Sequence, residues 1–346
     1  MNDLKYISAY SIPIIAVISI WLRDIYVYIT PIYVFGIIPI VELFTPASTE
    51  NLDEKIRNSK GKKRFYDWLL YLNLPIIYAV LIFTLYTVTS FDLKNFELAG
   101  IVISTGIVLG ANGINVGHEL GHRFTQERYI AKALLLPSLY MHFYIEHNFG
   151  HHLKAATQED PATAKYNQPV YSFWVTSTIG QYISAWKIQH TLLKQKSISF
   201  FSPKNDMFWY LIISTAYLLT ILILFGTQGL TIAIFSGIVG FLLLETINYI
   251  EHYGLLRKKN SSGRYERVNE IHSWNSNHLL GRILLFELTR HSDHHYRSSK
   301  KYQLLDHHHN SPQLPFGYPT SMVLSLFPPI WFLIMNKRIP NNMKTK

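Results

Sequence analysis

The sequence predicts an all-α integral membrane protein with six transmembrane helices and a cytoplasmic helical region that carries a histidine-ligated dimetal site. Three observations lead to this fold class. Hydrophobic residues make up 49% of the 346 positions and charged residues only 16%, which is too apolar for a typical soluble enzyme. Six stretches approach the ~20 apolar residues that a helix needs to cross a bilayer. Histidines gather in four short segments beside those stretches.

The six predicted spans follow one another in two groups. Only Arg23-Asp24 and a few further residues separate the first span from the second, which is typical of a helical hairpin. No small-residue cleavage site follows the first span, so we interpret it as a signal anchor that is retained. The predicted spans are Tyr6–Leu22, Tyr26–Phe44, Leu69–Val88, Leu98–Val116, Phe208–Phe225 and Leu230–Ile250.

The distribution of basic residues predicts the orientation in the membrane. With the N-terminus inside, all but two of the 32 Lys and Arg residues fall in cytoplasmic segments, the exceptions being Arg23 and Lys94. This topology also puts every histidine segment on the cytoplasmic side. Retention of positive charge inside explains the net charge of +10, and there is no nucleic-acid-binding motif, so we expect no nucleic-acid partner.

Three shorter apolar stretches fall below the length of a span. Ile130–Ile145 is broken by Pro137 and His142, and we expect a re-entrant or interfacial helix there. Phe173–Trp186 and Met322–Met335 are expected to lie at the membrane surface. Since no internal repeat and no second soluble domain is visible, we expect a single domain over residues 1–346.

Nine histidines in the four segments form the candidate metal ligands. Nine imidazoles are too many for one ion and fit two, and the absence of Cys leaves only nitrogen and oxygen ligands. A cluster of this size is also hard to explain as hydrogen bonding alone, because ionisable groups near apolar helices are costly. The nine are His118, His122, His147, His151, His152, His252, His291, His294 and His295.

Helical geometry predicts how each segment presents its rings. His118 and His122 lie four residues apart and project from one face of a helix. On an α-helix His147 and His151 share a face, whereas His152 is turned by about 100° toward a second ion. His291 and His295 share a face as well, with His294 close by.

Four carboxylates stand next to these histidines in the sequence. A residue beside a ligand on a helix points elsewhere, so these side chains are candidates for orienting imidazoles of neighbouring segments, or are plain solvated or capping charges. They are Glu119, Glu146, Glu251 and Asp293. We expect no catalytic side chain beyond the metal site. Of the remaining histidines, His142, His190, His272 and His278 are expected to form hydrogen bonds or to support the metal ligands, and His307–His309 to form a polar surface loop.

Two other functions use similar patterns. HELGH at 118–122 also fits the HExxH pattern of zinc proteases, in which the glutamate activates water, although that reading leaves six or seven histidines unexplained. A metal transporter is the other alternative. The placement of all nine histidines on one side of the membrane favours a catalytic site over a conduction path.

In combination, the motifs resemble those of the membrane-bound alkane 1-monooxygenases. HELGH, EHNFGHH, NYIEHYG and RHSDHH are joined by QEDPATA at 158–164, HSWNSNHLL at 272–280 and PFGYP at 315–319. The resemblance runs from about Glu42 to the C-terminus. It implies a non-haem centre of two Fe ions held by the nine histidines.

The resemblance also implies an activity and its partners. These are hydroxylation of the terminal methyl of medium-chain n-alkanes with dioxygen, using electrons from rubredoxin that an NADH-dependent rubredoxin reductase supplies. The expected location is the bacterial inner membrane, with both termini and the metal site cytoplasmic and with membrane lipid around the spans. Xylene-type methyl hydroxylases share the histidine pattern and remain an alternative, as do fatty acyl desaturases and hydroxylases. Of the desaturase boxes, HxxHH fits RHSDHH, whereas EHNFGHH reads HxxxHH.

Overall fold

The computed structural model describes residues 3–123, 126–341 and 343. The described residues form helices and connecting loops without a β-strand, which confirms the all-α class. The two chain ends, which we predict to be cytoplasmic, lie outside the described residues. The helices are η1 Asp3–Tyr10, α1 Ser11–Leu22, η2 Asp24–Tyr28, α2 Ile29–Ile32, η3 Tyr33–Ile37, α3 Ile38–Phe44, α4 Glu54–Lys62, α5 Phe65–Tyr71, α6 Asn73–Ser90, α7 Asn95–Val108, η4 Leu109–Ile114, α8 Asn115–Gly121, α9 Glu127–Leu135, η5 Leu136–Ser138, α10 Phe143–Glu146, η6 His147–His151, α11 His152–Lys154, α12 Val170–Gln195, α13 Asp206–His252, α14 Leu279–Leu284, α15 His291–Tyr296, η7 Tyr302–Leu304, α16 Tyr318–Ser325 and α17 Pro328–Met335.

The chain divides into two compact units, each assembled from three separate stretches of sequence. Unit 1 contains residues 1–36, 65–145 and 185–244, and unit 2 contains residues 37–64, 146–184 and 245–346. Two long helices, α12 and α13, therefore begin in one unit and end in the other. The single domain over residues 1–346 stays a prediction.

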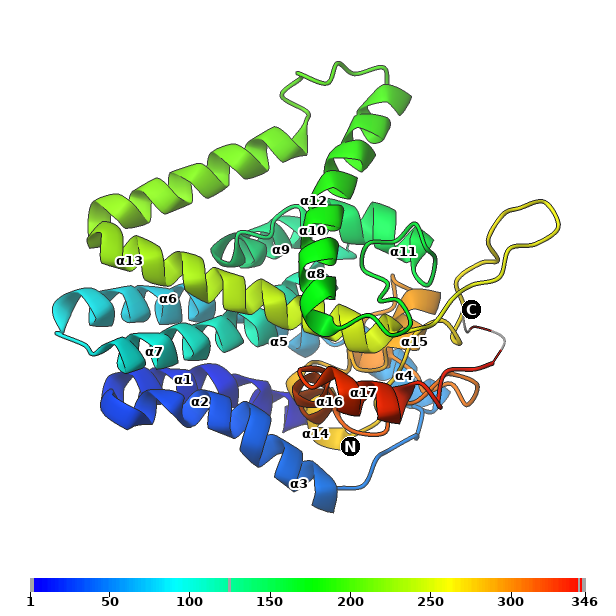
Figure 1. Ribbon diagram of the computed structural model, residues 1–346, viewed down its shortest axis with the longest axis horizontal. Coiled ribbons are helices and arrows are strands. Elements are labelled where there is room, and N and C mark those ends of the chain that lie inside the picture. The colour runs from blue at the N-terminus through cyan, green and yellow to red at the C-terminus, as the bar shows by residue number, and fades with distance from the viewer. Residues whose placement is uncertain (1–2, 124–125, 342, 344–346) are drawn as a thin grey trace. The chain divides into compact units, whose positions relative to one another are not determined.

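Long apolar helices dominate unit 1, as the composition predicts. Four of the six predicted spans each fall inside one apolar helical segment, and these segments are Asp3–Leu22, Asp24–Phe44, Phe65–Ser90 and Asn95–Gly121. In unit 1, α1 packs against both α6 and α7, which run side by side (Figure 1). Such lengths of apolar helix are those of a membrane protein.

The fifth and sixth predicted spans form one helical element, the 47-residue α13. A straight helix of that length would be about 70 Å long, more than twice the hydrocarbon core of a bilayer. The backbone leaves the helical region at Gly226, where φ is 63° and ψ is −169°. Figure 1 shows α13 folding back on itself within its length. Since the break falls between the two predicted ranges, it supports two spans, and the count of six remains a prediction.

The shorter apolar stretches break where proline predicts. Ile130–Ile145 contains the end of α9, the turn η5 with Pro137 and the start of α10, so no continuous spanning helix forms there. Met322–Met335 likewise divides into α16 and α17, and α17 begins at Pro328. By contrast, α12 is a continuous helix of 26 residues, longer than the expected Phe173–Trp186.

Unit 2 contains short helices joined by long polar loops. Its interior is rich in buried polar side chains, among them the guanidinium-bearing Arg290, which is 2% exposed and donates hydrogen bonds to the carbonyl oxygens of Leu305 and Glu50. Glu42, near the end of α3, accepts a hydrogen bond from the backbone N–H of Gly281 at 3.0 Å. These contacts fold the C-terminal loops of unit 2 around α15.

Candidate metal centre

The first histidine pair lies on α8 of unit 1. His118 is in the last turn of α8 and His122 caps it, with 5.1 Å between the ring centroids. The i,i+4 spacing thus brings the two rings together, as predicted. The preceding segment η4 is a π-helix, and α8 packs closely on α9, since a Cβ added at Gly117 would lie 3.2 Å from the carbonyl oxygen of Ala131. Glycine at this position therefore serves close helix packing.

Seven of the nine predicted ligands lie in unit 2, on four elements. His147 and His151 begin and end η6, His152 starts α11, His252 ends α13, and the last three lie on α15. Their nitrogens form two groups. His151, His252, His291 and His295 form one, and His147, His152 and His294 belong to the other, with the ligand nitrogens of each group within 4.8 Å of one another.

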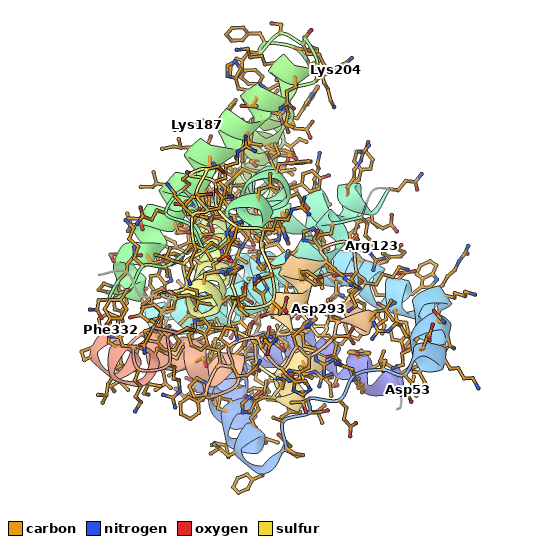
Figure 2. The ribbon with its side chains drawn as sticks, turned by 90° about the vertical axis from the view of Figure 1, so that its right-hand side faces the viewer. Asp53, Arg123, Lys187, Lys204, Asp293 and Phe332 are labelled. Atoms are coloured by element: carbon orange, nitrogen blue, oxygen red, sulfur yellow. The ribbon has the colours of Figure 1, made fainter. Side chains whose placement is uncertain are left out.

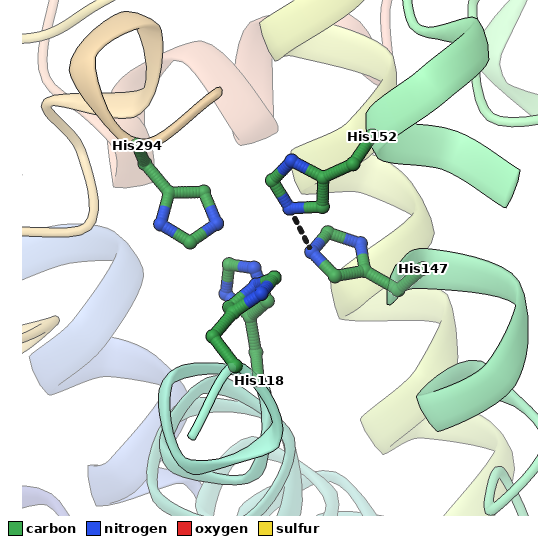
Figure 3. A group of neighbouring side chains, drawn as sticks. His118, His147, His152 and His294 are labelled. Atoms are coloured by element: carbon green, nitrogen blue, oxygen red, sulfur yellow. Dashed lines mark hydrogen bonds between the residues drawn. The ribbon is translucent and has the colours of Figure 1, made fainter. Parts of the chain in front are cut away.

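The π-helix η6 changes the pairing that α-helical geometry predicts. On an α-helix His147 and His151 would share a face, but a π-helix closes its hydrogen bonds from i to i+5. His147 Nε2 accordingly lies 3.0 Å from His152 Nε2, five residues on, and His151 belongs to the other group. Figure 3 shows the rings of His147, His152 and His294 turned toward one another. The expectation that the second segment serves two groups is met, with the roles of His151 and His152 exchanged.

The four-histidine group is completely buried. His252 Nε2 lies 3.3 Å from His291 Nε2, and the His252 ring centroid is 5.0 Å from that of His295. His291 and His295 join this group, whereas His294, between them in sequence, joins the other. The one turn of α15 thus supplies both groups, as its spacing predicts.

The chemistry of these nitrogens fits metal ions. Two nitrogens bound to one ion at about 2.0–2.1 Å lie about 3.0 Å apart at a right angle and about 3.4 Å apart at the tetrahedral angle. The distances of 3.0 Å and 3.3 Å between pairs of Nε2 atoms match this range. Within the described part of the chain, Nε2 of His151 and both ring nitrogens of His295 are buried without a hydrogen-bond partner. A neutral imidazole has one such nitrogen with a free lone pair, and an ion would bind that nitrogen in each ring.

Burial also keeps these imidazoles in the protonation state that binds metals. Desolvation lowers the pKa of His294 to about 3 and that of His295 well below its usual value. Both rings are therefore neutral at pH 7 and present a lone pair.

A carboxylate that the sequence reasoning did not single out orients one ring. Asp160 Oδ2 lies 2.9 Å from Nδ1 of His151 and accepts a hydrogen bond of 2.6 Å from the hydroxyl of Thr163. The backbone N–H of Ala162 donates to its other oxygen. This arrangement fixes the His151 tautomer and turns Nε2 toward the group. Asp160 belongs to the QEDPATA motif, and this motif is the feature of the sequence that could have pointed to it.

The surroundings of the buried Asp160 shift the pKa of its carboxyl group. Burial raises its pKa, but His151 and the Thr163 hydroxyl bond outweigh this and hold the pKa below its usual value. The carboxylate is therefore ionised beside His151.

The four predicted carboxylates have different surroundings. Glu251 is closest to the histidines: its Oε2 lies 3.1 Å from His291 Nε2, and its Oε1 accepts a 2.6 Å hydrogen bond from the Tyr318 hydroxyl. Glu119 pairs with Arg123 at 3.3 Å in unit 1. Their role in orienting imidazoles stays a prediction.

The other two are buried in unit 2. Asp293, labelled on α15 in Figure 2, accepts hydrogen bonds from His308 Nε2 at 2.8 Å and from Lys300. Glu146 directly precedes His147, and burial together with the nearby carboxylates Asp160 and Glu245 raises its pKa well above the usual value.

The remaining histidines are dispersed over other elements. His272 Nε2 lies 3.2 Å from Glu266, His278 Nδ1 lies 3.0 Å from the Ser276 hydroxyl, and the His190 ring contacts Phe200. In the loop 307–309, His307 is buried at 8% exposure and lies 3.1 Å from the Asn277 side chain. The contacts of His190, His272 and His278 agree with hydrogen-bonding and structural roles. The expected surface position is wrong for His307, because its ring packs against the Asn277 side chain.

Comparison with known proteins gives one family and several similar enzymes. The profile of the fatty acid desaturase family matches residues 96–324. The alkane 1-monooxygenase 2 of Pseudomonas aeruginosa is 37% identical over 311 residues, which cover 88% of this chain and 82% of that protein. The alkane 1-monooxygenase of Ectopseudomonas oleovorans is 35% identical over 333 residues, 94% of this chain and 83% of that protein.

A protein that acts on another class of compound is also similar. The hydroxylase component of the xylene/toluene monooxygenase of Pseudomonas putida is 29% identical over 283 residues, which cover 79% of this chain and 73% of that protein.

Proposed function

The chain belongs to the fatty acid desaturase family and, within it, to the alkane 1-monooxygenases, and from this premise we propose that it hydroxylates the terminal methyl of medium-chain n-alkanes at a di-iron centre. It is a membrane monooxygenase. We propose three specific properties: the metal is iron, each chain binds two ions, and the substrates are medium-chain alkanes.

The observation that carries the proposal is the sorting of the histidines into two groups. The seven rings of unit 2 divide into four and three, and each group has the nitrogen spacing of a metal site. We propose that His118 and His122, which the HELGH motif pairs on α8, complete the set of nine. A zinc protease needs only one ion and leaves most of these rings without a function.

The reaction converts an alkane, dioxygen, two electrons and two protons into a 1-alkanol and water. Bound iron would supply the binding and reductive activation of dioxygen. The imidazoles hold the ions, and Asp160 keeps the His151 ring in one orientation. Complete burial of the four-histidine group keeps bulk water away from the reacting atoms. The alkane reaches the protein from the bilayer, in which it is soluble.

We propose rubredoxin as the electron donor, reduced in turn by an NADH-dependent rubredoxin reductase. Rubredoxin would meet the enzyme in the cytoplasm, and the reductase would act on rubredoxin there. The proposed location is accordingly the bacterial inner membrane with the histidine segments and both termini inside, which the distribution of Lys and Arg favours.

One experiment tests the proposal. The purified protein is analysed for iron and zinc and then supplied with octane, dioxygen and reduced rubredoxin. We expect two irons per chain and 1-octanol as the product. An alkene formed from a fatty acyl substrate would instead identify a desaturase, and a benzylic alcohol from xylene without 1-octanol would identify the xylene-type enzyme. One zinc and no alcohol would exclude the proposal.

A further inference from the structure

A strongly basic loop projects from unit 2 between two of its histidine segments. Residues 257–267, which we call the basic hairpin, contain five basic residues and one acidic residue in eleven positions. The hairpin is part of the loop drawn in yellow in Figure 1. Lys258, Lys259, Arg264 and Arg267 are exposed.

The hairpin is held in shape by its own backbone. Lys259 and Tyr265 form an antiparallel bridge, and the N–H of Glu266 donates to the carbonyl oxygen of Lys258 at 3.0 Å. The turn uses Gly263 at φ 77° and the side chain of Asn260, which accepts hydrogen bonds from the N–H groups of the turn. The Lys259 ammonium lies 4.8 Å from the centroid of the Tyr265 ring, on the opposite strand of the hairpin.

A buried arginine ties the hairpin to the second histidine segment. Arg257 is 8% exposed and donates to the carbonyl oxygen of Glu266 at 2.9 Å and to that of Leu153 at 2.7 Å. Its backbone N–H donates to the carbonyl oxygen of Ala156 at 2.7 Å. The base of the hairpin therefore lies against the residue that directly follows His152, and it begins five residues after His252.

One large apolar side chain is exposed beside this joint. The Leu153 side chain is 69% exposed, although it stands next to a proposed metal ligand. An exposed apolar side chain near a buried redox centre, with exposed positive charge beside it, is typical of a surface where an electron-transfer protein docks briefly. The acidic groups that interact with Arg257 are Asp160, Glu266 and Glu159. Asp160 is already bonded to His151, and Glu266 to the Lys258 N–H and to His272.

We propose that the basic hairpin and Leu153 form the docking surface for a small acidic one-electron carrier protein. This rests on the proposed function, which requires two electrons per alkane. Each of two carriers is oxidised by one electron, and the electron enters through the short covalent path from Leu153 to His152. Complementary charge speeds the encounter and makes it dependent on salt.

The test compares charge reversal on the hairpin with charge reversal elsewhere. The variant Lys258→Glu/Lys259→Glu is matched by Lys194→Glu/Lys196→Glu, an exposed basic pair at the end of α12 and just beyond it in unit 1. Binding of oxidised rubredoxin to the metal-free protein is measured in nanodiscs of zwitterionic lipid and of mixed anionic lipid. Turnover of octane is measured with reduced rubredoxin and with a small chemical reductant.

We expect the hairpin variant to bind rubredoxin about tenfold more weakly at low salt, with the difference disappearing at high salt. Turnover with the chemical reductant stays at the wild-type level, and the control pair behaves as wild type. Equal binding by the hairpin variant and the wild type overturns the inference. So does a defect confined to anionic nanodiscs, because it would assign the hairpin to lipid headgroups.

These outcomes are separable from a failure of the proposed function. If the wild type forms no alcohol with either reductant, the proposed function is wrong. If alcohol forms but the hairpin variant responds to rubredoxin as the wild type does, only the docking surface is wrong.

Discussion

A single buried carboxylate decides the orientation of His151. Asp160 lies 2.9 Å from Nδ1 of the ring and is itself held by Thr163 and Ala162, so the opposite nitrogen is turned toward its three neighbours. Outer contacts of this kind raise the basicity of a ligand and reduce the freedom it loses on binding.

Replacing the charge of Asp160 should weaken metal binding without unfolding the protein. In Asp160→Asn the amide no longer attracts the Nδ1 proton with a full charge, and we expect metal affinity to fall by about 10- to 100-fold. The iron content per chain after dialysis against increasing concentrations of a chelator measures this affinity. The matched control is Asp206→Asn, whose partner is Lys132 in unit 1. Equal iron retention by Asp160→Asn and the wild type would show that the contact does not support the site.

His252 is the lone histidine of its segment and belongs to the four-histidine group. His252→Ala should abolish alcohol formation while leaving the helices folded, because it removes a proposed ligand at the end of α13 and leaves the packing of α1, α6 and α7 unchanged. Product analysis and far-ultraviolet circular dichroism give the two readouts. His190→Ala, in which a ring that contacts Phe200 is removed, is the control and should keep its activity. Full activity in His252→Ala removes this residue from the ligand set.

The element that distinguishes the centre is the short π-helix η6. Its wider turn brings His147 and His152 together and leaves His151 to face the other group. A second π-helix, η4, directly precedes α8. In η6, closing the turn five residues on rather than four presents the neighbouring His151 and His152 to different groups.

Close packing of the long helices depends on glycine. A Cβ at Gly106 of α7 would lie 2.4 Å from the Val239 Cβ of α13, so the helices must separate if it is added. We expect Gly106→Ala to destabilise the protein by about 1–3 kcal/mol. Thermal unfolding in detergent checks this. Gly36→Ala is the control. The added Cβ would lie 3.9 Å from its nearest neighbour, Ile32 Cγ2, so the midpoint temperature of unfolding should not fall. A midpoint unchanged in Gly106→Ala would argue against this contact.

For the whole molecule, the predicted orientation can be tested because the chain has no cysteine. Single cysteines replace Lys94, in a predicted outer turn, and Lys259, in the basic hairpin. A thiol reagent that cannot cross membranes should label Lys94→Cys in intact cells, whereas Lys259→Cys should react only after the cells are opened. Labelling of both sites in intact cells would contradict the topology.

The sequence by itself determined the helical class, the positions of the long apolar helices and the histidines worth considering. These features follow from local patterns: runs of apolar residues, the spacing of histidines along a helix, and the prolines that divide Ile130–Ile145 and Met322–Met335. The motifs also determined the family, because their combination is specific.

Only the tertiary structure decided which histidines of unit 2 group together and which acid supports them. The exchange of His151 and His152 depends on a π-turn, whose hydrogen-bond pattern has no periodic signature in the sequence. Asp160 lies nine residues from His151 and meets it through a loop closed by the Thr163 hydroxyl. Arg257 reaches Leu153 across about a hundred positions, and such contacts arise only when distant segments pack together.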